Sequence, residues 1–240
     1  MTCVLSTHYT DGTGDKMEVY NPLYKNQGIH VILSLFTVEK GITKVLLIKR
    51  KNQPFQDFWA LVGGALYNNE DLELGMIREI KEKTGIENID IHFSSIFGKV
   101  DRSPVMRMVA ITYVGVIDNS KISLLKESLH TSNADWFPLE EIPDLAFDHK
   151  EILLEGLETL REKILTTDIL KGLFPKGFTL PELQKTYESI FDNKIDRRNF
   201  RKRILKMNLL VDTNKTVQFK GNKPAKIYKF KQNRKSKKLF

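Results

Sequence analysis

The sequence has little cysteine and no long apolar run. Cys3 is the one cysteine among 240 residues, so the chain can form no intramolecular disulfide and no cysteine-rich metal site. No apolar stretch approaches the roughly 20 residues that a helix needs to cross a bilayer. The first residues also lack the basic start and apolar run of a signal peptide. We therefore expect a protein of the reducing cytoplasm that does not bind a membrane.

Basic residues are unevenly distributed along the chain. Residues 1–164 hold 18 lysines and arginines against 24 acidic residues, a net charge of −6. Residues 165–240 hold 20 against 6, a net charge of +14. Two modules with different partners would give this asymmetry, and a concentrated basic module is typical of a protein that binds a polyanion. A solvated basic surface with a basic tail would give the same composition, so the motifs must decide between the two.

The hydrophobic pattern of the first module indicates a mixed α/β domain. Helical spacing predicts a helix over 71–84, starting at Asn69 or Glu70 and ending at Gly85, and a second helix over 147–165. Apolar and β-branched runs predict strands at 29–37, 44–50, 59–62, 90–98, 106–117 and, followed by a turn, within 134–143.

The pattern changes after residue 165. A short helix over 168–174 precedes helices that start at Thr179 and Asp196, and short strands follow at 209–213, 216–220 and 225–231. Three helices and a hairpin in this order are typical of a winged helix-turn-helix. The expected organisation is an N-terminal segment (1–27), an α/β domain (28–164), a winged helix-turn-helix domain (165–231) and a basic tail (232–240).

An acidic cluster lies on the first predicted helix. Glu79, Glu82 and Lys83 are spaced i, i+3 and i+4, so they share one face. Clustered carboxylates repel each other unless a cation offsets them, and Mg²⁺ typically bridges one or two carboxylates to substrate phosphates. Gly63 and Gly64, just ahead, allow the backbone to approach a ligand closely. An ordinary solvated acidic face is the alternative.

The arrangement resembles the Nudix box, and the resemblance implies a Nudix fold. The residues that carry it are Gly64, Glu70, Arg78, Glu79, Ile80, Glu82, Gly85 and Ile86. The departure is Lys83, which stands where the box has a further glutamate.

Lys83 puts metal binding and catalysis in doubt. The resemblance implies that Glu79 and Glu82 would hold the metal, with the third carboxylate lost. Two unit charges 4 Å apart interact by about 4 kcal/mol at an effective dielectric of 20, so the lysine also opposes a divalent ion. Swinging the long side chain outward would relieve part of this repulsion. We expect weak or absent Mg²⁺ binding and a vestigial catalytic site.

The helix predicted from Asp196 combines an apolar face with a basic one. Phe200, Ile204 and Met207 share the apolar side. An arginine-rich helix packed on one side suits a DNA major groove and its phosphates. The candidate DNA contacts are Arg197, Arg198, Asn199, Arg201, Lys202 and Arg203 on this helix, and Lys220, Lys223 and Lys226 on the following wing.

A Nudix domain followed by a winged helix resembles the Nudix-related transcriptional regulators, which control NAD biosynthesis or sugar utilisation. The resemblance covers residues 28–231 and includes FGKVDRSPVMRMVAITY, LAFDHKEIL and DRRNFRKRIL. It implies that the Nudix domain senses ADP-ribose or a related phosphate compound, such as a sugar phosphate. It also implies candidate ligand contacts at Arg50, Gly63, Gly64, Arg102 and Arg107.

Three functions remain open at this point. The first is a ligand-responsive repressor. The second is a bifunctional ADP-ribose pyrophosphatase that also binds DNA, and the third is a hydrolase whose basic domain binds RNA or an acidic partner. For the first we expect a homodimer on a pseudo-palindromic DNA site. Trp59 is assigned to the core, and His149 to a structural role in orienting a loop or capping a helix.

Overall fold

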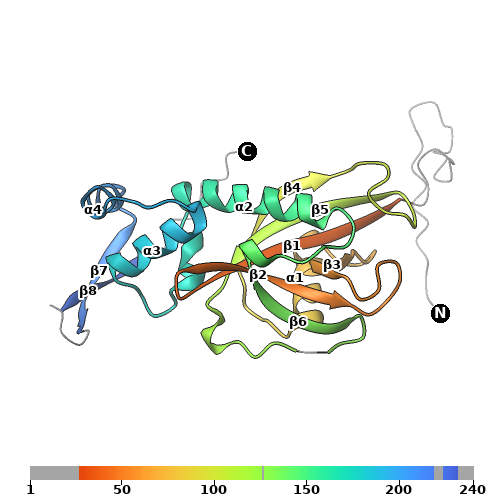
Figure 1. Ribbon diagram of the computed structural model, residues 1–240, viewed down its shortest axis with the longest axis horizontal. Helices are drawn as coiled ribbons and strands as arrows, with labels where there is room; N and C mark the ends of the chain where they lie inside the picture. The colour runs from red at the N-terminus through yellow and green to blue at the C-terminus, as the bar shows by residue number, and fades with distance from the viewer. Residues whose placement is uncertain (1–26, 126, 219–223, 232–240) are drawn as a thin grey trace, which may run out of the picture.

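The computed structural model describes residues 27–125, 127–218 and 224–231, which form two parts joined by one long helix (Figure 1). Cys3, the expected N-terminal segment except Gln27, and the expected tail 232–240 lie outside the described residues. The larger part is built on a six-stranded mixed sheet in the order β4–β5–β1–β3–β2–β6, with β1 and β5 parallel. Its elements are β1 (Gly28–Glu39), β2 (Ile42–Arg50), β3 (Trp59–Ala65), α1 (Leu72–Thr84), β4 (Ile91–Phe97), β5 (Met108–Val116), η1 (Asn119–Lys121), β6 (Thr131–Pro138), η2 (Leu139–Glu141) and α2 (His149–Thr166).

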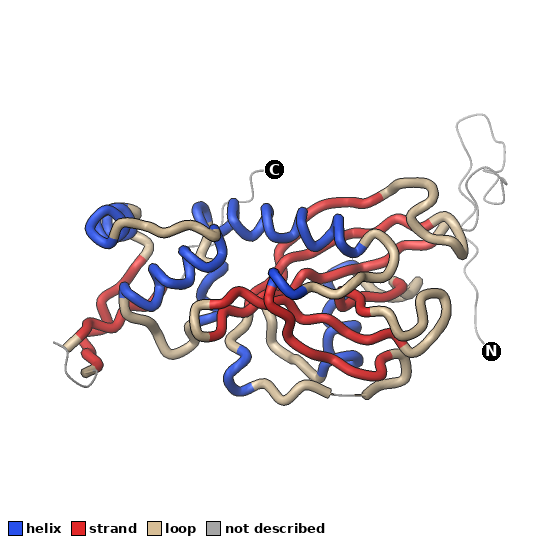
Figure 2. Tube along the Cα trace, viewed as in Figure 1, coloured by secondary structure: helices blue, strands red, loops and turns tan. Residues whose placement is uncertain are grey.

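The central strand β1 explains why the sheet carries a helix on each face. Successive side chains of a strand point to opposite faces. On one face Val31 and Leu33 join the core cluster that contains residues of α1. On the other face Ile32 and Phe36 join the cluster that contains residues of α2. Figure 2 shows the two helices on opposite sides of the sheet, as the expected Nudix fold requires.

The smaller part is the expected winged helix-turn-helix domain. Thr179 and Glu182 form a capping box at the start of α3, and the Asp196 carboxylate accepts a hydrogen bond from the Asn199 amide at the start of α4. Both predicted helix starts are therefore confirmed. Within the part of the chain that the structure describes, every helix is too short or too polar to span a membrane. The elements are η3 (Ile169–Leu173), α3 (Leu180–Phe191), α4 (Arg197–Lys206), β7 (Leu210–Val217) and β8 (Ala225–Phe230).

The start of α1 differs from the prediction, whereas its end does not. The N-terminal capping residue is Asp71, so the helix begins later than Asn69 or Glu70. Glu70 cannot cap the helix because its carboxylate accepts hydrogen bonds from the Tyr67 amide and from a guanidinium further along α1. Gly85 ends the helix at φ 74°, a left-handed conformation that glycine adopts without strain.

The strands of the wing also differ from the prediction. The strands expected at 209–213 and from residue 216 are one strand, β7, which ends at Val217 and pairs with β8; residues 219 and 220 lie outside the described residues. Asn214 adopts φ 58° at a register shift between Asp212 and Thr216, so the strand continues past the irregularity. Asparagine tolerates this left-handed conformation better than most residues.

The two domains share one continuous core through α2. Ile164 near the end of α2 clusters with Tyr187 of α3, and the Tyr187 hydroxyl donates a hydrogen bond to the Ile164 carbonyl over 3.3 Å. The Thr43 and Ser189 hydroxyl oxygens lie 2.7 Å apart and join β2 to α3. The expected boundary between residues 164 and 165 thus falls inside a helix that belongs to both domains.

Candidate functional site

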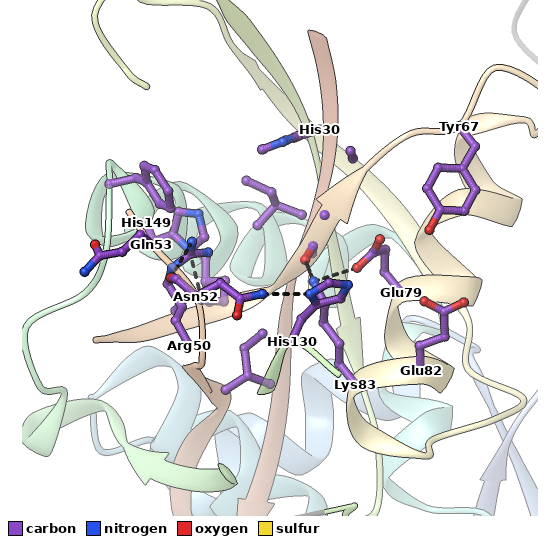
Figure 3. A pocket seen from close by; sticks show the side chains of 18 residues that line it. His30, Arg50, Asn52, Gln53, Tyr67, Glu79, Glu82, Lys83, His130 and His149 are labelled. Atoms are coloured by element: carbon purple, nitrogen blue, oxygen red, sulfur yellow. Dashed lines mark hydrogen bonds and ion pairs between the residues drawn. The ribbon is translucent and has the colours of Figure 1, made fainter. Parts of the chain in front are cut away.

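A cavity of about 360 Å³ lies where β1, β2 and β3 meet α1 and the start of α2 (Figure 3). A second cavity of about 330 Å³ adjoins it. The first contains the residues of the Nudix-like motif that were predicted to bind a ligand or a metal: Gly63, Gly64, Glu79, Glu82 and Lys83. Five residues line both cavities and form the wall between them: His30, Arg50, Ala65, Phe147 and His149.

Arg78 holds the acidic cluster together, a role that the sequence analysis did not assign. Its guanidinium donates hydrogen bonds to Glu70 over 2.6 and 2.8 Å and to Glu79 over 2.7 Å, and it lies 3.3 Å from Glu82. These bonds from Arg78 hold the pKa of the Glu70 carboxyl at about 2. The other face of the guanidinium stacks on the Tyr67 ring at 3.8 Å. The arginine inside the motif therefore offsets carboxylate charge from within the protein.

Lys83 points into the cavity rather than away from it. Its Nζ lies 2.7 Å from Glu79 Oε2 and donates a hydrogen bond to the Gly63 carbonyl oxygen. The Lys83 side chain is only 11% exposed and that of Glu79 only 7%. Lys83 thus does not take the outward conformation that would relieve its repulsion of a metal ion. A buried carboxylate is costly without a cation, and Lys83 supplies one.

The donor set does not fit the divalent cation that the family resemblance implies. Arg78 contacts Oε1 of Glu79 and Lys83 contacts Oε2, so both carboxylate oxygens already face cations. Glu82 is half-exposed and lies on the solvent side of the cluster. Among the residues in the structure, no three His, Cys, Asp or Glu side chains are grouped to hold a metal ion. A metal here would have to displace the ammonium of Lys83.

The three candidate phosphate-binding arginines have different surroundings. Arg50 lines both cavities, donates to the Pro54 carbonyl over 2.8 and 3.0 Å, and has no carboxylate of the described residues within ion-pair distance. Burial lowers its pKa. Arg102 lines the second cavity but forms a buried, bidentate ion pair with Asp148. Arg107 lines neither cavity, because it turns toward the Lys99 carbonyl. The structure thus leaves Arg50 as the arginine best placed to receive an anion.

Two neutral histidines stand beside Arg50. Burial, reinforced by the charge of Arg102, lowers the pKa of His30 to about 4 and that of His149 to about 3. The Leu61 amide donates to His149 Nδ1 over 3.0 Å, which assigns the ring proton to Nε2. His149 therefore holds β3 against α2, a structural role as expected, although it fastens a strand rather than a loop. Its position in the cavity wall was not foreseen.

The predicted DNA-binding helix presents its basic side to solvent. Phe200 and Ile204 are buried, whereas Met207 lies beyond the end of α4 and is exposed, so its expected place on the apolar face is wrong. α4 lies at the end of the molecule away from the Nudix sheet (Figure 1), whose strands line the cavities. The residues that α4 exposes include Arg197, Arg198, Asn199, Arg201, Lys202 and Arg203.

The other candidate residues are placed as follows. Lys226 on β8 is exposed and lies 2.7 Å from Asp212. Lys220 and Lys223 lie outside the described residues. Trp59 packs edge-on against Phe137, with ring centroids 4.6 Å apart, in agreement with its assignment to the core.

Comparisons with known proteins agree with this architecture. The NUDIX domain family model matches residues 28–156, and the model of the NrtR DNA-binding winged helix domain matches residues 170–230. The chain is 30% identical over 211 residues to the ADPR responsive transcriptional repressor NtrR of Acinetobacter baylyi, covering 86% of this chain and 83% of that protein.

Two solved structures of a second relative resemble the chain: one matches most of its length, and the other matches the Nudix domain. Shewanella oneidensis NrtR complexed with a 27mer DNA has a TM-score of 0.73 and 29% identity, covering 85% of this chain and 93% of that one. The NUDIX domain of the same NrtR complexed with ADP ribose has a TM-score of 0.52 and 30% identity, covering 59% of this chain and 94% of that one. The chain belongs to the family of Nudix-related transcriptional regulators, in which a NUDIX domain is joined to an NrtR winged helix domain.

Proposed function

We propose that this chain is a DNA-binding transcriptional regulator whose Nudix domain binds ADP-ribose, or a related phosphate-containing metabolite, without a metal and without hydrolysing it. Its relatives include an ADPR responsive repressor, an NrtR complexed with DNA and an NrtR NUDIX domain complexed with ADP ribose. The exposed basic side of α4 and the ligand-sized cavities of the Nudix domain support both halves of the proposal.

One observation carries the part of the proposal that concerns catalysis: the ammonium of Lys83 lies between Glu79 and the Gly63 carbonyl and faces the cavity. A cation at this position attracts a phosphate, as a metal ion would. It cannot lower the pKa of a bound water to generate a nucleophile, which is what a catalytic metal does. The site is therefore suited to hold a phosphate compound and leave it intact.

The same geometry disfavours the two hydrolase alternatives. Nudix hydrolysis needs a divalent ion to offset pyrophosphate charge and to supply the attacking water. Glu79 has no oxygen free of a cationic neighbour, and Glu82 is one half-exposed carboxylate. The basic helix α4 followed by a wing also argues against the third alternative, in which the basic domain binds RNA or an acidic partner.

The regulator is expected to act as a homodimer in the cytoplasm. One winged helix contacts few base pairs, and twofold proteins bind pseudo-palindromic sites whose half-sites are one helical turn apart. The dimer contact belongs on the Nudix domain, because α4 must stay free for DNA.

Calorimetric titration of the full chain with ADP-ribose in EDTA tests the proposed ligand binding. We expect saturable binding, and we expect chromatography of the mixture afterwards to recover ADP-ribose without AMP. Glu82→Gln, measured in parallel, should bind similarly. Binding that requires Mg²⁺, with AMP produced by the wild type but not by Glu82→Gln, would support the bifunctional enzyme instead.

A further inference from the structure

The short turn that joins α3 to α4 is fastened to one residue of α3 (Figure 1). The backbone carbonyl of Glu188 accepts hydrogen bonds from the Asp192 amide and from the Asn193 amide. The carboxylate of the same residue accepts a hydrogen bond from the Ile195 amide over 3.0 Å. Ile195 directly precedes Asp196, the capping residue of α4. Glu188 therefore holds the turn from the end of α3 to the start of α4.

A second side chain of α3 holds the same turn. The amide group of Gln184, one helical turn before Glu188, donates to the Glu188 carboxylate and to the Ile195 carbonyl, each over 2.9 Å. Both backbone polar groups of Ile195 are thus bound by side chains of α3. The bond from Gln184, followed by that from the Ile195 amide, lowers the pKa of Glu188. We call Gln184 and Glu188 the turn clamp.

Glu188 lies where a carboxylate is unfavourable for the helix itself. It belongs to the last turn of α3, where the helix dipole favours a cation, and that turn contains no basic side chain. Lys194 lies 3.9 Å away but is 95% exposed, so it offsets little of this repulsion. The Glu188 side chain is nevertheless only 15% exposed. Its bonds to the turn are the interactions that account for a carboxylate at this position.

The packing of α4 against α3 is apolar, so it leaves the angle between the helices to the turn clamp. Phe200 and Ile204 are the buried side chains of α4. The Phe200 ring meets the Tyr187 ring edge-on, with centroids 5.3 Å apart. Apolar burial is non-directional, whereas a hydrogen bond weakens steeply away from its preferred geometry. The hydrogen bonds of the clamp are therefore suited to fix the direction in which α4 leaves the turn.

We propose that Gln184 and Glu188 are positioning residues for DNA recognition, which hold α4 at the angle at which its side chains reach base edges. This inference rests on the DNA-binding half of the proposed function. Hydrogen bonds to base edges require precise placement of the side chain, within about 0.5 Å and 10–20°. Attraction to phosphates depends on the number of basic side chains and carries no sequence information. Loss of the clamp should therefore weaken the preference for the specific site and spare non-specific binding.

Two replacements of Glu188 separate its hydrogen bond from its charge. Glu188→Gln keeps an oxygen that can accept from the Ile195 amide, whereas Glu188→Leu does not, and both variants lose one negative charge. Thr179→Ala is the control for stability, because it removes the capping box at the other end of α3 and leaves the turn unchanged. Thermal midpoints followed by circular dichroism place the destabilisation of all three variants on one scale.

Fluorescence anisotropy then measures the affinity of each full-length variant for two duplexes, one selected by the wild type from a random library and one of shuffled sequence. Glu188→Leu should bind the selected duplex about tenfold more weakly than Glu188→Gln, a loss typical of one base contact. Both variants should bind the shuffled duplex equally well and with the same salt dependence, because they carry the same basic side chains. Thr179→Ala should keep the wild-type ratio of the two affinities.

Three results would overturn the inference. The ratio of the two affinities could be the same in Glu188→Leu and Glu188→Gln, so that the hydrogen bond to the turn does not matter. Glu188→Leu could bind both duplexes more weakly by the same factor, which would mean that the clamp only keeps the domain folded. Thr179→Ala could lose as much preference as Glu188→Leu, so that destabilisation alone explains the effect. All three leave the proposed function intact, whereas a wild type that selects no duplex would refute its DNA-binding half.

Discussion

Lys83 Nζ lies 2.7 Å from Oε2 of Glu79, on the opposite side of that carboxylate from the guanidinium of Arg78, which contacts Oε1. Glu79 therefore has a cation at each oxygen, and both cations are side chains of the same helix. A divalent ion can be diluted or chelated away, whereas a lysine on the chain cannot. On the proposed function, we therefore expect phosphate binding at this site not to depend on the supply of a metal ion.

Replacing Lys83 tests whether its ammonium takes part in ligand binding. Lys83→Met should weaken ADP-ribose binding about tenfold, because a positive charge beside the phosphates is lost and Glu79 Oε2 loses its partner. Lys83→Glu should bind Mn²⁺ more tightly than the wild type, since a carboxylate replaces a cation next to Glu79 and Glu82. Titration of ADP-ribose and of Mn²⁺ by calorimetry measures both effects. Wild-type affinity for ADP-ribose in Lys83→Met would show that Lys83 is only a structural partner of Glu79.

The buried ion pair between Arg102 and Asp148 fixes the start of α2 to the second cavity. Two hydrogen bonds of 2.8 and 2.9 Å join the side chains, and Arg102 is only 2% exposed. Arg102→Met should lower the free energy of unfolding by about 3–5 kcal/mol, because the buried Asp148 loses its partner. Urea unfolding monitored by circular dichroism measures the loss.

A double variant serves as the control for that prediction. Replacing both members of a buried ion pair with apolar side chains is often nearly neutral. Arg102→Met combined with Asp148→Leu should therefore be more stable than Arg102→Met alone. A double variant that is less stable than either single variant would mean that the two side chains act separately.

Stability should fall as the pH falls below the ordinary histidine range. Burial lowers the pKa of His30 to about 4 and that of His149 to about 3. Between pH 6.5 and about 4, the unfolded chain binds protons at these rings that the folded chain does not, so acid favours unfolding and the effect is absent above pH 6.5. Between pH 7 and pH 5, the free energy of unfolding of His30→Leu should fall by about 1–2 kcal/mol less than that of the wild type. Identical losses in the two proteins would place the acid sensitivity elsewhere.

The basic side of α4 should account for most of the DNA affinity. Arg201→Glu with Lys202→Glu should abolish binding to a duplex selected from a random library by the wild type, while ADP-ribose binding is retained, because both side chains are exposed on α4, away from the Nudix sheet. The affinity of the wild type for DNA should fall steeply with salt, since phosphate contacts release counterions.

A second double variant serves as the control. Lys81→Glu with Lys99→Glu makes the same charge change on exposed side chains of the Nudix domain and should bind DNA almost normally. Equal loss in both double variants would implicate net charge rather than α4.

The features that sequence predicted well are local ones. Gly85 ends α1, and Thr179 and Asp196 begin α3 and α4, because a helix boundary depends on residues within one turn. The spacing of the acidic motif likewise depends on one helix. The fold class followed from these local patterns and from the family resemblance that they carry.

The features that sequence missed depend on residues far apart in the chain. The inward turn of Lys83 depends on the Gly63 carbonyl, 20 residues away. The ion pair that Arg102 forms is made with Asp148, 46 residues away in the chain. The division of the site into two cavities also requires loops from separate strands to meet, which spacing along one segment cannot reveal.

DNA affinity and ADP-ribose chemistry measured in the same sample give the most direct test of the central claim. The fluorescence anisotropy of the labelled, selected duplex is followed in EDTA while ADP-ribose is added, and the nucleotide is then analysed by chromatography. We predict that ADP-ribose changes the DNA affinity by at least about fivefold, that DNA changes the ADP-ribose affinity by the same factor, and that the ADP-ribose is recovered intact. Two results together would contradict the account. In EDTA, ADP-ribose would leave the DNA affinity unchanged. With Mg²⁺, the DNA affinity would change only while ADP-ribose is converted to AMP and ribose 5-phosphate.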